Sequence, residues 1–279
     1  MAALFAVLTL FALIDRRIGV TSAVVTYVPY LWAFFLFFVL SEFLSFAVGI
    51  WVLAVLSFLA LREYFTVVDL RIQDRWGMVA AYLAIPFMFY CIQVDWYGMF
   101  IISIPVYAFL VVPFAITLGG REPDGVVLSI GALDLGLFLL VYCIGHIGYL
   151  AFYSDWTAIL VVLAVAACDL FAWLLRARDR APLRRVTYQI LAPFPVVVLL
   201  AVALRPWTGV PLGHSLVLAV GIPALVAIGC HTIDHVETDL GIDRHNLQPG
   251  RGQVINTMKS FLYVGPVVFH YLRYFLEAY

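Results

Sequence analysis

The chain has 279 residues, of which 65% are hydrophobic and 12% are charged, and its formal net charge is −1. A soluble domain is about half apolar and about a quarter charged, so this composition excludes an ordinary soluble globular protein. The few basic residues form no run large enough for a nucleic-acid-binding face. The sequence therefore predicts a polytopic membrane protein that does not bind nucleic acid.

Apolar segments follow one another along most of the chain. A short first segment precedes Arg16. Its charges follow its apolar core, whereas those of a signal peptide precede it, so we expect the segment to be retained as a helix rather than cleaved. The later segments of spanning length lie at about 22–40, 43–61, 76–94, 97–118, 135–152, 156–175, 187–204 and 211–229. A tenth, at about 257–276, is expected to span, to dip into the membrane or to lie at its surface. Lipid-exposed backbone must satisfy its own hydrogen bonds. The prediction is an all-α bundle of about nine to ten transmembrane helices, a single membrane-embedded domain over 1–279.

Arginine is distributed unevenly between the links. The links after odd-numbered segments hold eleven arginines, and the links after segments 2, 4, 6 and 8 hold only Arg205. The positive-inside rule places the odd-numbered links in the cytoplasm and the N-terminus outside. The polar segment 230–259 follows the ninth segment and is therefore predicted to be cytoplasmic. The compact loops and this asymmetry favour a bacterial inner membrane. The eleven arginines are Arg16, Arg17, Arg62, Arg71, Arg75, Arg121, Arg176, Arg178, Arg180, Arg184 and Arg185.

The polar groups gather in one late run, 229–259, which reads GCHTIDHVETDLGIDRHNLQPGRGQVINTMK. It holds three of the six histidines and Lys259, the only lysine of the chain. If the protein acts on a polar group, we expect the chemistry here.

A metal site is one hypothesis for the first part of this run. If 230–242 is a helix, then His231, His235 and Asp239 share one face at i, i+4 and i+8, with Asp234 beside them. Imidazole and carboxylate on one stripe are able to hold a divalent metal. The alternative is a polar helix at the membrane surface whose groups bond to one another and to water.

A phosphate-binding turn is the hypothesis for the second part. Gly250 and Gly252 allow the backbone to turn sharply and to approach a ligand. Arg251 offers a planar guanidinium for phosphate, and Asn256 and Lys259 follow at helical spacing. The alternative is a plain turn that joins two cytoplasmic helices.

Two carboxylates lie inside predicted spans. Asp134 and Asp169 are both nearer the cytoplasmic end of their segments, and intramembrane carboxylates usually face a polar cavity or a partner. His146 is interpreted as a packing histidine with satisfied hydrogen bonds. The arginines of 176–185 mark topology and suit contact with anionic lipid headgroups. The cysteines have no zinc or redox spacing and are expected to be buried small residues.

Several motifs resemble those of the phosphatidate cytidylyltransferases, the CDP-diacylglycerol synthases. The similarity extends over roughly 50–275. It rests on Ala60-Leu61-Arg62-Glu63-Tyr64-Phe65, Asp95-Trp96-Tyr97-Gly98, Asp169-Leu170-Phe171-Ala172-Trp173, Asp239-Leu240-Gly241-Ile242, Pro249-Gly250-x-Gly252, Ser260 and Pro266-Val267-Val268-Phe269-His270-Tyr271.

The resemblance implies a polytopic enzyme that makes CDP-diacylglycerol from CTP and phosphatidic acid with Mg²⁺ at a polar cytoplasmic-side cavity. The family's terminal signature, H-G-G-x-x-D-R-x-D, corresponds here to 251–259. Arg251 stands for its histidine, and Asn256 and Lys259 stand for its two aspartates. The family's upstream Gly-Asp is Gly229-Cys230, and only Asp169 and Asp239 keep acidic positions.

Two functions follow as expectations. In the first, the chain is a divergent enzyme in which Asp169, Asp234 and Asp239 form a rearranged metal site, with Asp169 and Asp239 as the candidate catalytic residues, and Arg251 binds phosphate. In the second, the chain has lost activity and serves as a lipid-binding or structural subunit, as a homodimer or in a larger membrane complex. We favour loss of activity, because the signature carboxylates are absent. A transporter is a weaker possibility, since no inverted halves with broken helices are evident.

Overall fold

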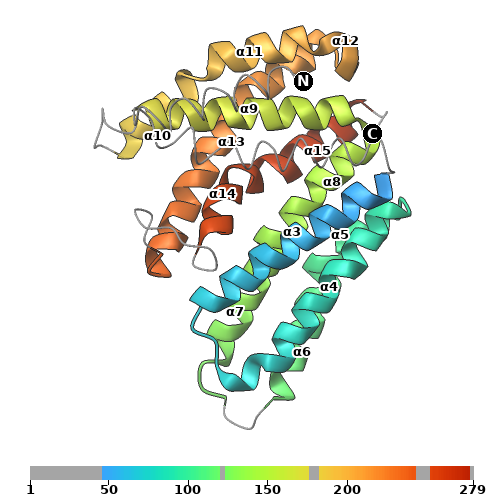
Figure 1. Cartoon of the computed structure of the whole chain (residues 1–279), viewed down its shortest axis with the longest axis vertical. Helices are drawn as coiled ribbons and strands as arrows, with labels where there is room; N and C mark the ends of the chain where they lie inside the picture. The colour runs from blue at the N-terminus through green and yellow to red at the C-terminus, as the bar shows by residue number, and fades with distance from the viewer. Residues whose placement is uncertain (1–45, 120–122, 176–181, 243–251, 277–279) are drawn as a thin grey trace, which may run out of the picture. The chain divides into compact units, whose positions relative to one another are not determined.

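A computed structural model describes residues 46–119, 123–175, 182–242 and 252–276 (Figure 1). The chain divides into two units, Met1–Val52 and Leu53–Tyr279. The first unit contributes only the beginning of one helix to the described residues. The contacts described below all lie within the second unit.

Every regular element in these ranges is a helix, which confirms the all-α prediction. The elements are α3 (Phe46–Val67), η1 (Ile72–Asp74), α4 (Arg75–Gln93), α5 (Tyr97–Ile102), η2 (Ser103–Ala108), α6 (Phe109–Thr117), α7 (Val126–Leu137), η3 (Phe138–Tyr142), α8 (Cys143–Tyr153), α9 (Asp155–Leu175), α10 (Pro182–Leu191), α11 (Phe194–Ala203), α12 (Arg205–Thr208), α13 (Leu212–Asp239), α14 (Gln253–Leu262) and α15 (Val264–Leu276).

Seven helical stretches of the described residues are long and apolar enough to cross a membrane, as expected of an integral membrane protein. They are Phe46–Val67, Ile72–Gln93, Tyr97–Thr117, Val126–Tyr153, Asp155–Leu174, Leu183–Ala203 and Leu212–Asp239. These seven correspond to the third to ninth predicted segments. The first two predicted segments, which precede residue 43, lie outside the described residues.

Two of the seven stretches are much longer than the sequence predicted. The sixth begins at Val126 rather than near 135, and the ninth continues to Asp239 rather than ending near 229. The predicted boundary at 229 followed the change from apolar to polar residues. The helix continues because its polar side chains on one side pack against α14, so no backbone break is needed where hydropathy falls.

The predicted tenth segment, 257–276, is two helices rather than one. α14 begins earlier, at Gln253, and ends at Leu262, and α15 begins at Val264. Neither has the length to cross a membrane as a single rod. The polar residues of 253–259 therefore belong to a helix that packs against α13.

Two helices organise the packing of the second unit. α13 contacts α9, α10, α11 and α14, and α8 contacts α4, α9 and α15. Four large side chains of α4, α5, α8 and α15 are fully buried: Phe89, Phe100, Tyr149 and Phe269. α8 thus packs against both α4 and α15, which are far apart in the sequence.

A close contact between α8 and α15 depends on glycine. A Cβ atom built on Gly265 lies 2.8 Å from the Cys143 carbonyl oxygen and 3.1 Å from Ile147 Cγ1. We expect Gly265→Ala to lower stability by about 1–3 kcal/mol, because backbone on α8 must move away. Thermal unfolding in detergent measures this. The control is Gly221→Ala in α13, where a Cβ meets nothing within 4 Å and the helix gains up to about 1 kcal/mol. Equal melting temperatures for the two variants would contradict the packing argument.

Candidate functional site

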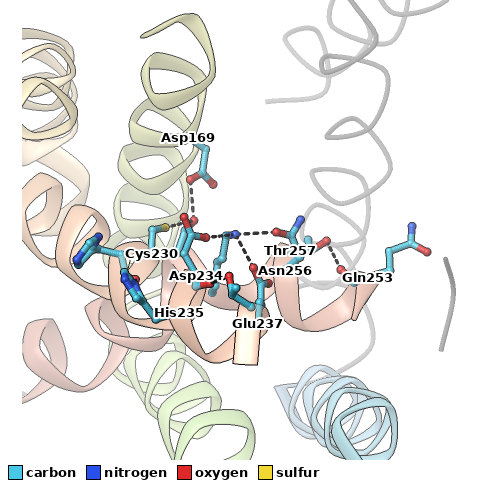
Figure 2. A network of polar contacts seen from close by, with 12 residues as sticks. Asp169, Cys230, Asp234, His235, Glu237, Gln253, Asn256 and Thr257 are labelled. Atoms are coloured by element: carbon cyan, nitrogen blue, oxygen red, sulfur yellow. Dashed lines mark hydrogen bonds and ion pairs between the residues drawn. The ribbon is translucent and has the colours of Figure 1, made fainter. Parts of the chain in front are cut away.

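Lys259 of α14 bonds to polar residues of α13 and α14, among them Asp234, Glu237 and Asn256, which are labelled in Figure 2. Its ammonium Nζ donates to Asp234 Oδ1 at 2.7 Å and to Glu237 Oε2 at 3.1 Å, both on α13. It also donates to Asn256 Oδ1 at 2.6 Å, one turn earlier on α14. The three N–H donors of the ammonium are thus matched by three oxygen acceptors. We call these four residues the Lys259 centre.

Helical spacing explains how the Lys259 centre forms. Each helix contributes two residues three positions apart, and such residues lie on one helix face. The side of α13 that carries Glu237 also carries the buried Ile233, so it faces the protein interior. The exposed fractions of the side chains are 14% for Lys259, 19% for Asp234 and 0% for Glu237. Charges with so little solvent around them interact more strongly than charges on an open surface.

A second polar chain adjoins the centre. Ser260, the next residue of α14, donates its hydroxyl to Asp169 Oδ1 on α9 at 2.6 Å. Cys230 Sγ of α13 lies 3.3 Å from the same hydroxyl oxygen. The structure therefore brings Asp169, one of the two predicted catalytic residues, beside the polar run of α13 and α14 (Figure 2).

The first turn of α14 is capped by a carboxylate from α3. Glu63 Oε1 accepts the backbone N–H of Gln253 at 2.8 Å, and Oε2 accepts that of Val254 at 2.6 Å. The side chain is 3% exposed. Gly252 precedes the helix with φ +92°, a left-handed conformation that favours glycine. The free N–H groups of a helix N-terminus attract anions, and here two of them bind a residue of the protein itself.

This capping bears on the predicted phosphate-binding turn. Gly250 and Arg251 lie outside the described residues, and Gly252 is the N-cap of α14. Two amides that the turn would direct toward a phosphate already donate to Glu63. Asn256 and Lys259, the other residues predicted to bind phosphate, instead bond to each other and to α13.

The predicted metal ligands separate onto two sides of α13. His231, His235 and Asp239 share an exposed face, as their spacing predicted, and the two imidazole rings lie 4.6 Å apart. Asp234 instead turns toward Lys259. Within the ranges that the structure describes, no group of three or more His, Cys, Asp or Glu side chains is close enough to hold a metal ion. The predicted set of four ligands therefore does not assemble.

The Mg²⁺ that the family resemblance implies does not fit the Lys259 centre either. Asn256 and Lys259 occupy the positions of the two signature aspartates, and the Lys259 ammonium lies 2.7 Å from Asp234 Oδ1. A divalent cation placed among these oxygens would meet a positive charge at contact distance. Asp239, the other predicted catalytic residue, is exposed at the end of α13.

The two remaining intramembrane candidates differ in their surroundings. His146 is fully buried; its Nδ1–H donates to the Tyr142 carbonyl oxygen at 2.8 Å, and its Nε2 lies 3.2 Å from His270 Nε2. It is thus a packing histidine with satisfied nitrogens. Asp134 of α7 has both carboxyl oxygens buried and bonded to none of the described residues.

A separate polar cluster joins α8, α15 and the turn between α4 and α5. Arg273 donates to Tyr153 Oη at 2.6 Å, and its guanidinium carbon lies 3.6 Å from the centre of the Tyr97 ring. Tyr149 Oη donates to Asp95 Oδ1 at 2.6 Å. Asp95 has φ +53°, which an aspartate in a tight turn tolerates. These contacts hold α15 against α8.

Comparison with known proteins finds a distant relative of the chain. The chain is 24% identical over 237 residues to the uncharacterized protein YnbB of Escherichia coli (strain K12), an alignment that covers 79% of this chain and 78% of YnbB. No family model matches, and no solved structure matches. The relative carries no functional description.

Two residues of the site were not singled out from the sequence. Glu63 lies in a segment that resembles the cytidylyltransferases, but nothing local signalled that it would bond to residues 190 positions later. Glu237 belongs to the polar run 229–259 and received no role of its own there. Its position four residues after the buried Ile233 was the signal that could have placed it on the interior face.

Proposed function

We propose that the chain is a phosphatidate cytidylyltransferase-like integral membrane protein that has lost cytidylyl transfer and serves as a lipid-binding or structural subunit of a membrane complex. The observation that carries the proposal is the Lys259 ammonium bonded to Asp234, Glu237 and Asn256. Transfer chemistry that depends on Mg²⁺ needs carboxylates free to hold the ion and phosphates free to bridge to it. Here the two carboxylates nearest to Lys259, those of Asp234 and Glu237, are bonded to its ammonium.

The capped end of α14 supports the same proposal. Phosphates of a nucleotide bind most readily to free amides at a helix N-terminus. Glu63 occupies two such amides with a negative charge, which opposes a nucleotide phosphate at that place. A centre with its own cation and its own carboxylate cap is suited to holding helices together rather than to exchanging ligands.

Lipid is the partner that the surface favours. The described spans expose many large apolar side chains, among them Leu110, Phe114 and Leu199, as expected of helices that face lipid or other helices. We propose a bacterial inner membrane location with 230–259 on the cytoplasmic side. The arginine-rich link 176–185 then lies on the same side, where basic residues attract anionic phospholipid headgroups.

An activity assay tests the loss of transfer directly. Purified protein with CTP, phosphatidic acid and Mg²⁺ should form no CDP-diacylglycerol, while an active cytidylyltransferase in the same detergent forms it. The control is Asp169→Asn, which removes the carboxylate bonded to Ser260. Product that appears with the natural chain and disappears with Asp169→Asn would overturn the proposal and establish a rebuilt enzyme. Native mass spectrometry of the same preparation should show bound anionic phospholipid.

A further inference from the structure

The environment of the Lys259 ammonium is that of a small cation site. Three oxygens lie 2.6–3.1 Å from Nζ, two from carboxylates of α13 and one from an amide of α14. Carboxylate and amide oxygens are also the donors that hard divalent cations such as Mg²⁺ and Mn²⁺ prefer.

We infer that the Lys259 ammonium is a built-in replacement for a divalent cation, and that its removal converts the centre into a site for Mg²⁺ or Mn²⁺. The oxygens are held by two long-range constraints: the α13–α14 contact and the Glu63 cap on the first turn of α14. They therefore remain near one another when the ammonium is absent. Two carboxylates and one amide are sufficient protein ligands for a cation that keeps several waters.

The consequence for the natural chain is independence from metal. A dissociable ion would make the α13–α14 contact depend on the ion's concentration. The Lys259 ammonium is covalently attached, so it stays in place at every metal-ion concentration and cannot be removed by a chelator. Because Lys259 is the only lysine of the chain, no other lysine is available to take its place.

Mn²⁺ binding to the full-length protein in detergent tests the inference. Lys259→Met removes the charge and keeps the length of the side chain. We expect this variant, stripped with EDTA, to bind one Mn²⁺ per chain by calorimetry and by loss of the free-ion paramagnetic resonance signal. With Mn²⁺ at about 100 times its dissociation constant, its melting temperature should rise by about 5–10 °C. The natural chain should show neither effect.

A matched variant locates the ion. Lys259→Met combined with Asp234→Asn and Glu237→Gln keeps the same shape and removes both carboxylate charges, so it should bind no Mn²⁺. Equal Mn²⁺ binding by the natural chain and Lys259→Met would overturn the inference, as would binding by the triple variant. A Lys259→Met protein that fails to fold both with and without Mn²⁺ would also overturn it, since the ion was expected to replace the ammonium. None of these readouts depends on cytidylyl transfer, so the inference and the proposed function fail separately.

Discussion

Lys259→Met in metal-free buffer should lower the free energy of unfolding by about 3–5 kcal/mol, the usual effect of breaking a buried ion pair by removing one partner. The loss arises because Glu237 is fully buried and Asp234 is only 19% exposed, so solvent cannot replace the ammonium well. Thermal and denaturant unfolding in detergent, followed by circular dichroism, measures the change.

Two controls separate this effect from general damage to α14. Arg75→Met removes an exposed cation at the beginning of α4 and should change stability by less than about 0.5 kcal/mol. Adding Glu237→Gln to Lys259→Met removes the most deeply buried negative charge and should restore much of the loss. If the double variant is less stable than Lys259→Met alone, the charge imbalance is not the cause.

The second large effect is expected at the cap of α14. Glu63→Ala removes two hydrogen bonds from a buried carboxylate to the amides of Gln253 and Val254. Bonds to charged groups contribute about 1.5–3 kcal/mol each, so we expect a loss of about 3–5 kcal/mol. Glu63→Gln retains one carbonyl acceptor and should lose about half as much.

Amide hydrogen exchange localises this effect. In Glu63→Ala the amides at the beginning of α14 should exchange faster, while those in the middle of α4 should be unchanged. Asp69→Ala, at an exposed acidic residue just after α3, is the control and should leave exchange and melting temperature as they are. Faster exchange across all helices in Glu63→Ala would show that Glu63 acts on the whole bundle rather than as a cap.

The spans could be predicted because long apolar runs have few structural alternatives in a membrane. The boundary near 229 failed because the helix there continues into polar residues. Hydropathy marks the point near 229 where side chains change, but α13 ends at Asp239, where its backbone turns. The break at Tyr263 was also missed, although Gly265 and Pro266 follow it and a proline is tolerated in the first turn of a helix but not in its interior.

The site could be predicted only in part, for a geometric reason. Helical spacing grouped His231 with His235 and Asp239, and these do share a face. Spacing alone does not show which face of α13 meets another helix. Asp234 was therefore grouped with the exposed histidines, whereas it bonds to Lys259, 25 residues later. Such a pairing depends on how α14 packs against α13. Helical spacing in the sequence describes each helix separately and does not indicate how the two helices pack.

The Glu63 cap also imposes an order in time on the making of this protein. Glu63 is synthesised 190 residues before Gln253, the first residue whose amide it binds. A chain grows at about 5–20 residues per second, so α3 waits roughly 10–40 s for its partner. During that interval the Glu63 carboxylate must form its hydrogen bonds with water or with the insertion machinery. The carboxylate of Glu63 on α3 therefore gains its two amide donors only when α14 has been synthesised. In a chain truncated before residue 253, α3 would lack these hydrogen bonds.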